Sequence, residues 1–224
     1  ELGYVYNRGA ANLRQSASSR IIGIIVNDLT NSFFPELAVG MDMVMQSAGY
    51  VQFLSNSAES VDRQREVIAS MREHGIAGLI FSPARGTEAA DLKPLVASGI
   101  PVVAVVRNVV GAKVSTLFSD NYAGAKDAVR HLIALGHRRI AFLGGISNTT
   151  VFTERVQGWR EALAEGGLEA QNSLVIATTA SRAGGVAAIE RALLLPEPPT
   201  AALCFNDAAA FGVCDGLRAA GKEP

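Results

Sequence analysis

Short apolar segments alternate with longer amphipathic segments along the chain, and this alternation restricts the fold more than any other feature. The residues IIGIIV (21–26), GLIF (78–81) and VVAVV (102–106) are short and rich in β-branched side chains, as buried strands are. Segments with apolar residues at helical spacing follow them, at 35–48, 61–74 and 89–98, and in the first of these the apolar side is expected to hold Leu37, Met41, Val44 and Ala48. Strands that alternate with helices form parallel sheets through right-handed crossovers, so the predicted fold class is α/β.

The second half of the chain repeats this alternation. Strands are expected at IAFL, LVI and AALCF, and helices at 122–135, 153–165, 182–194 and 207–219. RIIGIIV at 20–26 resembles RIAFLGG at 139–145, and GIAGLIFSP at 75–83 resembles PTAALCFND at 199–207, at offsets of 119 and 124 residues. Similar offsets favour two lobes of one βαβ design that meet near 115–124, although apolar strands also match by coincidence.

Size and composition indicate a globular protein. The 224 residues fit two lobes of about a hundred residues each. The net charge is −1, and no apolar run approaches the ~18 residues that cross a bilayer. No basic segment followed by an apolar stretch opens the sequence, so we expect a cytoplasmic protein. Cys204 and Cys214 are expected to be free thiols, with a disulfide as the alternative.

Signatures of catalysis and metal binding are missing from the sequence. His74, His131 and His137 lack the spacing of metal ligands. No nucleophile elbow or phosphate-binding loop follows any expected strand, and the adjacent Gly144 and Gly145 are far short of a dinucleotide-binding fingerprint. We therefore expect no catalytic residue, no metal and no cofactor.

Polar and aromatic residues follow several of the expected strands. Ligands of parallel sheets bind beyond the carboxyl ends of the strands, so these residues are candidates for binding. The candidates are Phe33, Phe34, Arg107, Arg155, Asn206 and Asp207. Together they suit a small polar molecule, because rings pack on its apolar face while planar polar groups pair with hydroxyls or acids. Each residue also has a structural alternative: the rings as core, Asp207 as a helix cap, Arg155 as a surface charge.

Four segments, in order, resemble the lactose-repressor (LacI/GalR) family of bacterial transcription regulators. They are GYVYNRGAANLR, DNYAGAKDAVRHLIALGHRRIAFLGG, ERVQGWREAL and TAALCFNDAAAFGV. The resemblance implies a periplasmic-binding-protein-like type I fold, in which two Rossmann-like lobes clamp a small ligand. It puts the six candidate residues at effector-binding positions. It assigns Asp120 and Asn121 to a crossover element with a structural role.

The resemblance also implies a division of the chain. Residues 1–19 correspond to a hinge or linker after a helix-turn-helix headpiece, 20–120 to the N-terminal effector-binding lobe, and 121–224 to an incomplete C-terminal lobe. In the hinge, Leu13 matches a leucine that enters the minor groove of operator DNA, and Ala10 matches a small residue on the same face. Without DNA, we expect residues 1–19 to be poorly ordered, because isolated short helices are marginal in water.

The sequence departs from the family pattern at three places. Val106 stands where an acidic residue usually follows the first-lobe strand, so a frequent partner for ligand hydroxyls is missing. Ala11 stands where the hinge often has an arginine. The final stretch of the family, with another strand and a ligand-contacting aspartate, is absent.

The leading functional hypothesis is an allosteric transcriptional repressor. Its partners would be operator DNA and a small effector, first of all a sugar or sugar derivative, with a purine or small acid next. A homodimer or dimer of dimers is expected, with contacts from helix 35–48, notably Met41 and Met45, and from 61–74. A solute-binding protein for sugar uptake shares the fold and is the alternative; a Rossmann-type enzyme ranks third.

Overall fold

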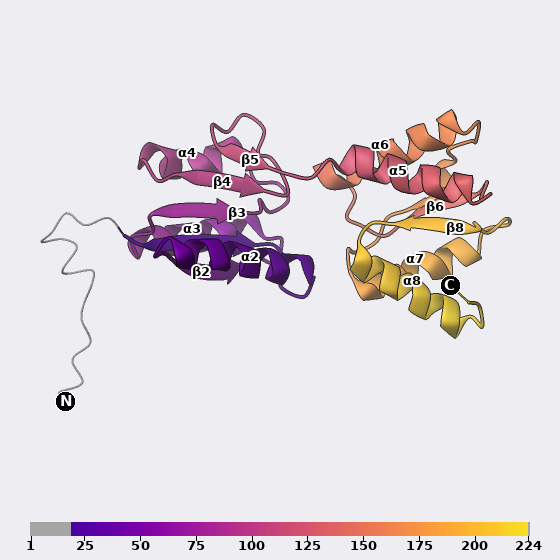
Figure 1. Ribbon diagram of the computed structural model, residues 1–224, viewed down its shortest axis with the longest axis horizontal. Coiled ribbons are helices and arrows are strands. Elements are labelled where there is room, and N and C mark those ends of the chain that lie inside the picture. The colour runs from indigo at the N-terminus through magenta and orange to yellow at the C-terminus, as the bar shows by residue number, and fades with distance from the viewer. Residues whose placement is uncertain (1–18, 224) are drawn as a thin grey trace, which may run out of the picture. The chain divides into compact units, whose positions relative to one another are not determined.

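The computed structural model describes residues 19–223, which form two compact units divided between Phe118 and Ser119 (Figure 1). We call them the first lobe and the second lobe. The sequence analysis placed this boundary two residues later, between 120 and 121. Both lobes alternate strands and helices around parallel sheets, so the α/β fold class is confirmed.

A five-stranded parallel sheet forms the centre of the first lobe. Its strands are β1 (Ile21–Val26), β2 (Val51–Asn56), β3 (Gly78–Phe81), β4 (Val102–Val105) and β5 (Ser115–Leu117), in the order β2-β1-β3-β4-β5. Its helices are α2 (Phe33–Ser47), α3 (Val61–Glu73) and α4 (Ala89–Ala97). The chain moves from β1 outward to β2 and then to β3 on the other side of β1. Ligands of parallel sheets bind at such a reversal of strand order.

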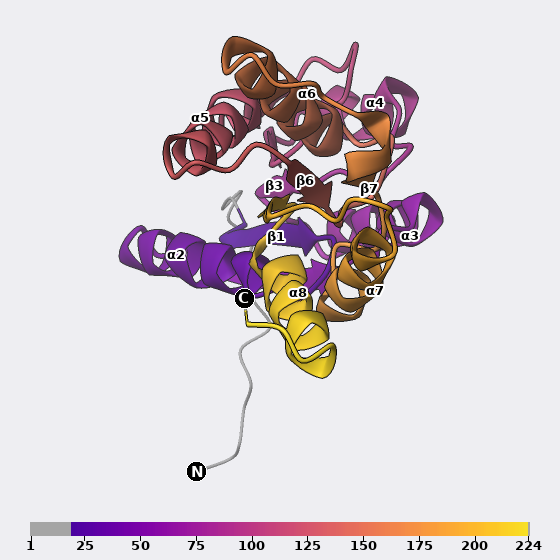
Figure 2. The ribbon, with the colours of Figure 1, turned by 90° about the vertical axis from the view of Figure 1, so that its right-hand side faces the viewer.

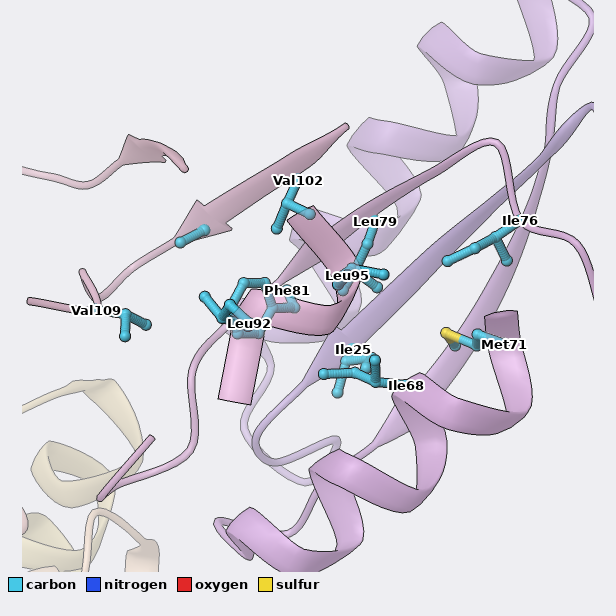
Figure 3. Packing of buried hydrophobic residues seen from close by; sticks show 11 residues of the cluster. Ile25, Ile68, Met71, Ile76, Leu79, Phe81, Leu92, Leu95, Val102 and Val109 are labelled. Carbon is cyan, nitrogen blue, oxygen red and sulfur yellow. The ribbon is translucent and has the colours of Figure 1, made fainter. Parts of the chain in front are cut away.

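The larger core of the first lobe lies where α3 and α4 cover one face of the sheet. Figure 3 shows Ile68 of α3 beside Ile25 of β1, and Leu92 of α4 beside Phe81 of β3. These four side chains are at most 6% exposed. Their spacing explains the two helices, because apolar residues recur in each at intervals that keep them on one side.

The helix α2 covers the opposite face. Side chains of a strand alternate between the faces, so Ile24 and Val26 of β1 point away from Ile25 and toward α2. They pack with Phe34, and Met41 and Met45 lie partly buried against them.

The apolar face of α2 is therefore rotated from the one expected. The helix begins at Phe33, and its buried side is marked by Phe34 and Met41, whereas Val44, expected on that side, is 70% exposed. Met41 and Met45, expected at a dimer contact, lie partly buried against their own lobe, and their contact with a second copy stays a prediction. The exposed apolar side chains of α2 include Val39 and Met43.

The second lobe has a three-stranded parallel sheet in the order β7-β6-β8. The strands are β6 (Ile140–Leu143), β7 (Val175–Ile176) and β8 (Ala201–Cys204), and a short 3-10 helix (Asn172–Leu174) precedes β7. The helices are α5 (Asn121–Ala134), α6 (Thr150–Glu165), α7 (Arg182–Leu193) and α8 (Asp207–Ala219). Figure 2 shows α5 and α6 on one face of this sheet and α7 and α8 on the other.

Close packing inside the second lobe depends on one large residue and two glycines. Trp159 of α6 is fully buried, and its Nε1 donates to the carbonyl oxygen of Ile140 at 3.2 Å. Across α7 and α8, Gly185 lies against the backbone of Ala209, and Gly212 lies against the backbone of Arg182. A methyl group at either glycine would overlap the facing helix backbone.

The strand arrangement explains the internal similarity in the sequence. The similar segments 20–26 and 139–145 form β1 and β6, and the segments 75–83 and 199–207 contain β3 and β8. In each lobe the two strands pair as parallel neighbours. Two strands, β2 and β5, were not expected from the sequence.

Candidate functional site

A polar cluster lies at the carboxyl ends of four strands in the first lobe. Asn27 follows β1, Glu59 follows β2, Pro83 follows β3 and Arg107 follows β4. Arg107 binds Glu59 through two hydrogen bonds, from Nη2 to Oε1 at 2.7 Å and from Nη1 to Oε2 at 2.9 Å. Nη1 of Arg107 and Nδ2 of Asn27 each donate to the Pro83 carbonyl oxygen at 3.2 Å. The four loops thus meet at one point of the sheet edge.

The carboxylate of Glu59 is the centre of this cluster. Besides Arg107, the Nδ2 of Asn27 donates to its Oε1 at 3.2 Å and the backbone N–H of Arg85 donates to its Oε2 at 3.1 Å. Burial acts to raise the pKa of Glu59, but the hydrogen bonds and charge of Arg107, with the donors of Arg85 and Asn27, outweigh burial and lower the pKa. Glu59 is therefore ionised in the folded protein at neutral pH.

Three buried polar atoms of this edge have no hydrogen-bond partner among the described residues. They are Oδ1 of Asn27, Oγ of Ser82 and Nε of Arg107. Asn27 is 1% exposed and Ser82 is fully buried. Buried polar atoms are nearly always paired in proteins, with protein groups or with water. The oxygens of Asn27 and Ser82 can therefore still accept a hydrogen bond, and Nε of Arg107 can still donate one.

The backbone of this edge is strained at the two loops that carry the ion pair. Val106 has φ of 68°, and the N–H of Arg107 donates to the carbonyl oxygen of Val105 at 2.7 Å. This three-residue turn is the rare γ-turn with positive φ, and a β-branched residue at its centre is unusual. Ala58 and Glu59 also have positive φ, of 50° and 58°. Strain of this kind gathers at functional sites.

The two predicted aromatic residues of the first lobe differ in exposure. Phe33, the first residue of α2, is 48% exposed, whereas Phe34 is 7% exposed and belongs to the core under α2. Their rings meet edge to face at 5.2 Å between centroids. Phe33 therefore offers a ring to a ligand, and Phe34 supports it from the core.

Arg155 is the candidate binding residue of α6 in the second lobe. It lies in the second turn of α6, whose first turn is capped by Thr149. Its Nε donates to Oδ1 of Asn121 at 3.0 Å, its Nη1 donates to the carbonyl oxygen of Phe205, and its guanidinium carbon lies 5.0 Å from the centre of the Phe205 ring. Burial lowers the pKa of Arg155, opposed by the charges of Asp207 and Glu154. Arginine stays protonated after such a shift.

The first residues of α5 join Arg155 to the start of the second lobe. Asp120 caps α5, because its Oδ1 accepts from the N–H of Ala123 at 2.8 Å. Asn121 is 8% exposed, and its Nδ2 donates to Glu154 at 3.0 Å and to the carbonyl oxygen of Ser119 at 3.1 Å. Asp120 has the structural role expected of it, but Asn121 also contacts a candidate binding residue.

Asn206 and Asp207 begin α8. Asn206 is its N-cap: Oδ1 accepts from the N–H of Ala209 at 2.8 Å, and Nδ2 donates to the carbonyl oxygen of Ala180 at 3.2 Å. Asp207 is the first helical residue and is exposed. Asn206 therefore caps the helix. The Asp207 carboxylate has no hydrogen bond or ion pair among residues 19–223, and its charge acts on Arg155.

A cavity of about 280 Å³ lies beside Arg155 in the second lobe. Its walls come from the segment 119–121, from Gly124 and Ala125 of α5, and from Leu203 and Cys204 of β8. Cys204 and Cys214 are both free, as expected, and burial, with the nearby Cys214, raises the pKa of Cys204 to about 11. Within residues 19–223, no three His, Cys, Asp or Glu side chains are grouped to hold a metal ion.

The structure thus puts the predicted residues at the carboxyl edges of two sheets, Arg107 with Phe33 and Phe34 in one lobe and the other three in the second lobe. Their contact with an effector stays a prediction. Ala10 and Leu13 lie outside the described residues. The sequence analysis missed Glu59 and Asn27. Glu59 follows β2, so a correct assignment of VQFLSN as a strand would have directed attention to it.

Residues 19–223 match the model of a family described as periplasmic binding proteins and sugar binding domain of the LacI family. The chain belongs to this family. Among curated relatives, it is 33% identical to the maltose regulon regulatory protein MalI of Escherichia coli, over all of this chain and 65% of the relative. It is 31% identical to catabolite control protein A of Priestia megaterium, over 97% of this chain and 65% of the relative.

Solved structures show the same similarity for this LacI-type domain. A putative ribose operon repressor from Burkholderia thailandensis superimposes with a TM-score of 0.82 at 31% identity, over 92% of this chain and 76% of that one. A putative transcriptional regulator of the LacI family from Sanguibacter keddieii superimposes with a TM-score of 0.80 at 27% identity, over 92% of this chain and 74% of that one. No helix within residues 19–223 is both long and apolar enough to span a bilayer.

Proposed function

We propose that this LacI-type domain is the hinge and effector-binding core of an allosteric, DNA-binding transcriptional repressor of the bacterial cytoplasm. The observation that carries the proposal is the match of residues 19–223 to the sugar-binding domain of the LacI family. The chain spans 65% of the length of the two curated relatives, and both are named as regulatory or control proteins. In this proposal, residues 1–19 contact operator DNA through Ala10 and Leu13.

The proposed effector is a sugar or sugar derivative, and the residues at the carboxyl edge of each sheet are the candidates for its contacts. In the second lobe, Arg155 supplies donors and the exposed Asp207 supplies an acceptor, a combination that suits neighbouring hydroxyl groups. In the first lobe, the unpaired Oδ1 of Asn27 and the exposed ring of Phe33 add an acceptor and an apolar surface.

A role in sugar uptake is not favoured. The family description covers periplasmic binding proteins as well as LacI-type domains, so the fold by itself fits both roles. The relatives that align with essentially the whole chain are named as regulators of genes, and this favours regulation.

The experiment that tests the function is operator binding by the full-length protein. A thermal-shift screen of sugars, nucleosides and small acids first identifies a stabilising metabolite. Fluorescence anisotropy on DNA from the protein's own promoter region then measures operator affinity with and without that metabolite. A repressor binds the DNA in a sequence-dependent manner, and the metabolite changes the affinity. Sequence-independent binding that no metabolite alters would contradict the proposal.

We also propose a homodimer formed through an apolar surface of the first lobe. The surface is centred on the exposed apolar side chains of α2: Val39, Met43 and Val44. The neighbouring edge strand β2 adds exposed side chains on both of its faces, Val51 and Phe53 on one and Leu54 on the other, and Tyr50 precedes it. On α2 the exposed fractions reach 61–70%. Apolar patches of this kind on a folded protein commonly mark an interface. A two-fold dimer also suits a palindromic operator.

A further inference from the structure

The arginine at the edge of the first-lobe sheet is already neutralised by the chain itself. Both terminal nitrogens of Arg107 bind the Glu59 carboxylate, and the side chains of Arg107 and Glu59 are 13% and 26% exposed. A guanidinium that faces a carboxylate in this bidentate geometry has satisfied the pairing that it would otherwise offer to a phosphate or an acid.

Competition from a ligand anion is further opposed by the other donors on Glu59. Asn27 and the backbone N–H of Arg85 donate to the same two oxygens and keep the Glu59 carboxylate where it is. If an anion drew Arg107 away, this partly buried carboxylate would remain without its cation. Breaking such a pair leaves an uncompensated charge, which is costly. The loops that carry the pair adopt positive φ at Glu59 and at Val106, beside Arg107, so the backbone holds the two side chains together.

Within the described residues, the loops that follow β1 to β4 carry no surplus of positive charge, although Arg63 of α3 binds the carbonyl oxygen of Asn56 at the end of β2. In the five residues that follow each of the strands β1 to β4, the charged side chains are those of Asp28, Glu59, Arg85 and Arg107. Two acids therefore accompany two arginines. In the second lobe, the negative charges of Asp207 and Glu154 act on Arg155.

We infer that the Glu59–Arg107 pair selects against anionic effectors, so that the effector of this protein is an uncharged polyol, such as an unphosphorylated sugar, and phosphorylated sugars and small acids are rejected. This inference rests on the proposed function and deepens it. Apart from Nε of Arg107, whose charge Glu59 already neutralises, the groups left for the ligand in the first lobe are neutral: the unpaired oxygens of Asn27 and Ser82 and the ring of Phe33. Such groups recognise hydroxyls and the apolar face of a sugar ring.

The test uses the full-length protein with inorganic phosphate as the probe, titrated by calorimetry at constant ionic strength. The wild-type protein is expected to bind phosphate no tighter than about 10 mM. The Glu59→Gln variant frees the charge of Arg107 and is expected to bind phosphate at least about tenfold tighter. Glu66→Gln is the matched control, because this exposed glutamate of α3 carries the same charge in the same lobe. It is expected to behave as wild type.

The double variant Glu59→Gln/Arg107→Gln removes both charges and should lose the gained phosphate binding. A folded Glu59→Gln variant, judged by circular dichroism, that binds phosphate no better than wild type would overturn the inference. If this variant does not fold, phosphate titrations of the wild-type protein and of Arg107→Gln test the inference instead. Submillimolar phosphate binding by wild type that Arg107→Gln abolishes overturns the inference, and absence of wild-type binding supports it.

The inference and the proposed function fail in different ways. If a phosphorylated sugar releases the wild-type protein from its operator and requires Arg107, the protein is a regulator but the selectivity inference is wrong. If no metabolite alters operator binding, the regulatory function fails, whatever the phosphate titrations show. If an unphosphorylated sugar releases the operator and its 6-phosphate does not, both stand.

Discussion

Arg107 and Arg155 come from different lobes, and each is held by groups of its own lobe. Arg107 pairs with Glu59, and Arg155 binds Asn121 and the Phe205 carbonyl. Side chains that are fixed in this way lose little conformational entropy when they bind a ligand. The two arginines differ in the groups that hold them. The Glu59 carboxylate neutralises Arg107, whereas Arg155 is hydrogen-bonded to uncharged oxygens, and the acids that act on its charge, Asp207 and Glu154, are not hydrogen-bonded to it.

The Arg155→Ala variant is expected to bind the effector about ten to a hundred times more weakly, because loss of a charge-assisted hydrogen bond costs about 1.5–3 kcal/mol. Calorimetry with the identified effector measures this change. Arg160→Ala is the control, since Arg160 lies on the same helix but is exposed and bonds only to Asn172 among the described residues. If Arg155→Ala bound the effector with undiminished affinity, Arg155 would not be an effector-binding residue.

The Glu59–Arg107 pair also predicts a pH dependence of stability. The pKa of Glu59 is lowered in the folded state from its ordinary value of 4.5, so the pair stabilises the fold above that value, and the contribution is lost as the pH falls through the folded pKa. At pH 7, Glu59→Gln should reduce the free energy of unfolding by about 1–3 kcal/mol, because it leaves a charged donor without its partner.

Urea unfolding followed by circular dichroism at pH 7 and at pH 3 measures this difference between wild type and variant. The difference should shrink markedly at pH 3, whereas Glu66→Gln should stay within about 0.5 kcal/mol of wild type at both values. An equal difference at both pH values would show that the ionised carboxylate contributes nothing.

At the scale of the elements, helices and buried strands were predictable because their signals are local. The helix α8 has the predicted bounds, and α7 and α4 end one residue early. The strand β2 was missed because it is an edge strand with much of its apolar surface exposed, so its sequence shows neither clean alternation nor a continuous buried run. The candidate site was predicted only in part for the same reason, since the partner of Arg107 follows that missed strand.

The N-cap of α8 shows a second limit of prediction from the local sequence. Asp207 and Asn206 are adjacent, and both side chains can cap a helix. Only the backbone conformation decides between them: Asn206 is extended, with φ of −155°, and Asp207 is already helical. Likewise, nothing local in the sequence indicates that Val106 adopts positive φ, a conformation imposed by the loops around it.

The contact between α7 and α8 gives a prediction at this scale. A Cβ at position 212 would meet the carbonyl oxygen of Arg182, a backbone atom that cannot rotate away. Gly212→Ala should therefore destabilise the second lobe by about 1–3 kcal/mol despite the better helix propensity of alanine. Gly124→Ala on α5, where a Cβ meets nothing within 4 Å, should instead be neutral or stabilising.

Denaturant unfolding followed by tryptophan fluorescence measures this effect, because Trp159 is the only tryptophan of the chain and lies in the second lobe. Equal stability of Gly212→Ala and Gly124→Ala would mean that the two helices separate at little cost.

At the scale of the whole molecule, the proposed dimer surface predicts how a substitution changes the oligomeric state. Val44→Glu puts a charge in the middle of the exposed apolar side chains of α2 and β2 and should shift the full-length protein from dimer to monomer, with a loss of operator affinity. Light scattering and sedimentation measure the mass. Val96→Glu, a similar change at a 40% exposed valine on α4, should leave the dimer intact. A dimer that survives Val44→Glu would place the interface elsewhere.

Every strand pairing in residues 19–223 is parallel and stays within one lobe. Ile22, for instance, pairs with Gln52 and with Gly78, so the hydrogen bonds of β1 form only when segments distant in the sequence come together. Such long-range pairing slows folding and leaves apolar strands exposed meanwhile. Within residues 19–223, however, the five strands of the first lobe end at Leu117, before the first strand of the second lobe begins at Ile140. On the ribosome these five strands can therefore pair with one another before the described strands of the second lobe are synthesised, and this order limits wrong pairing between the two sheets.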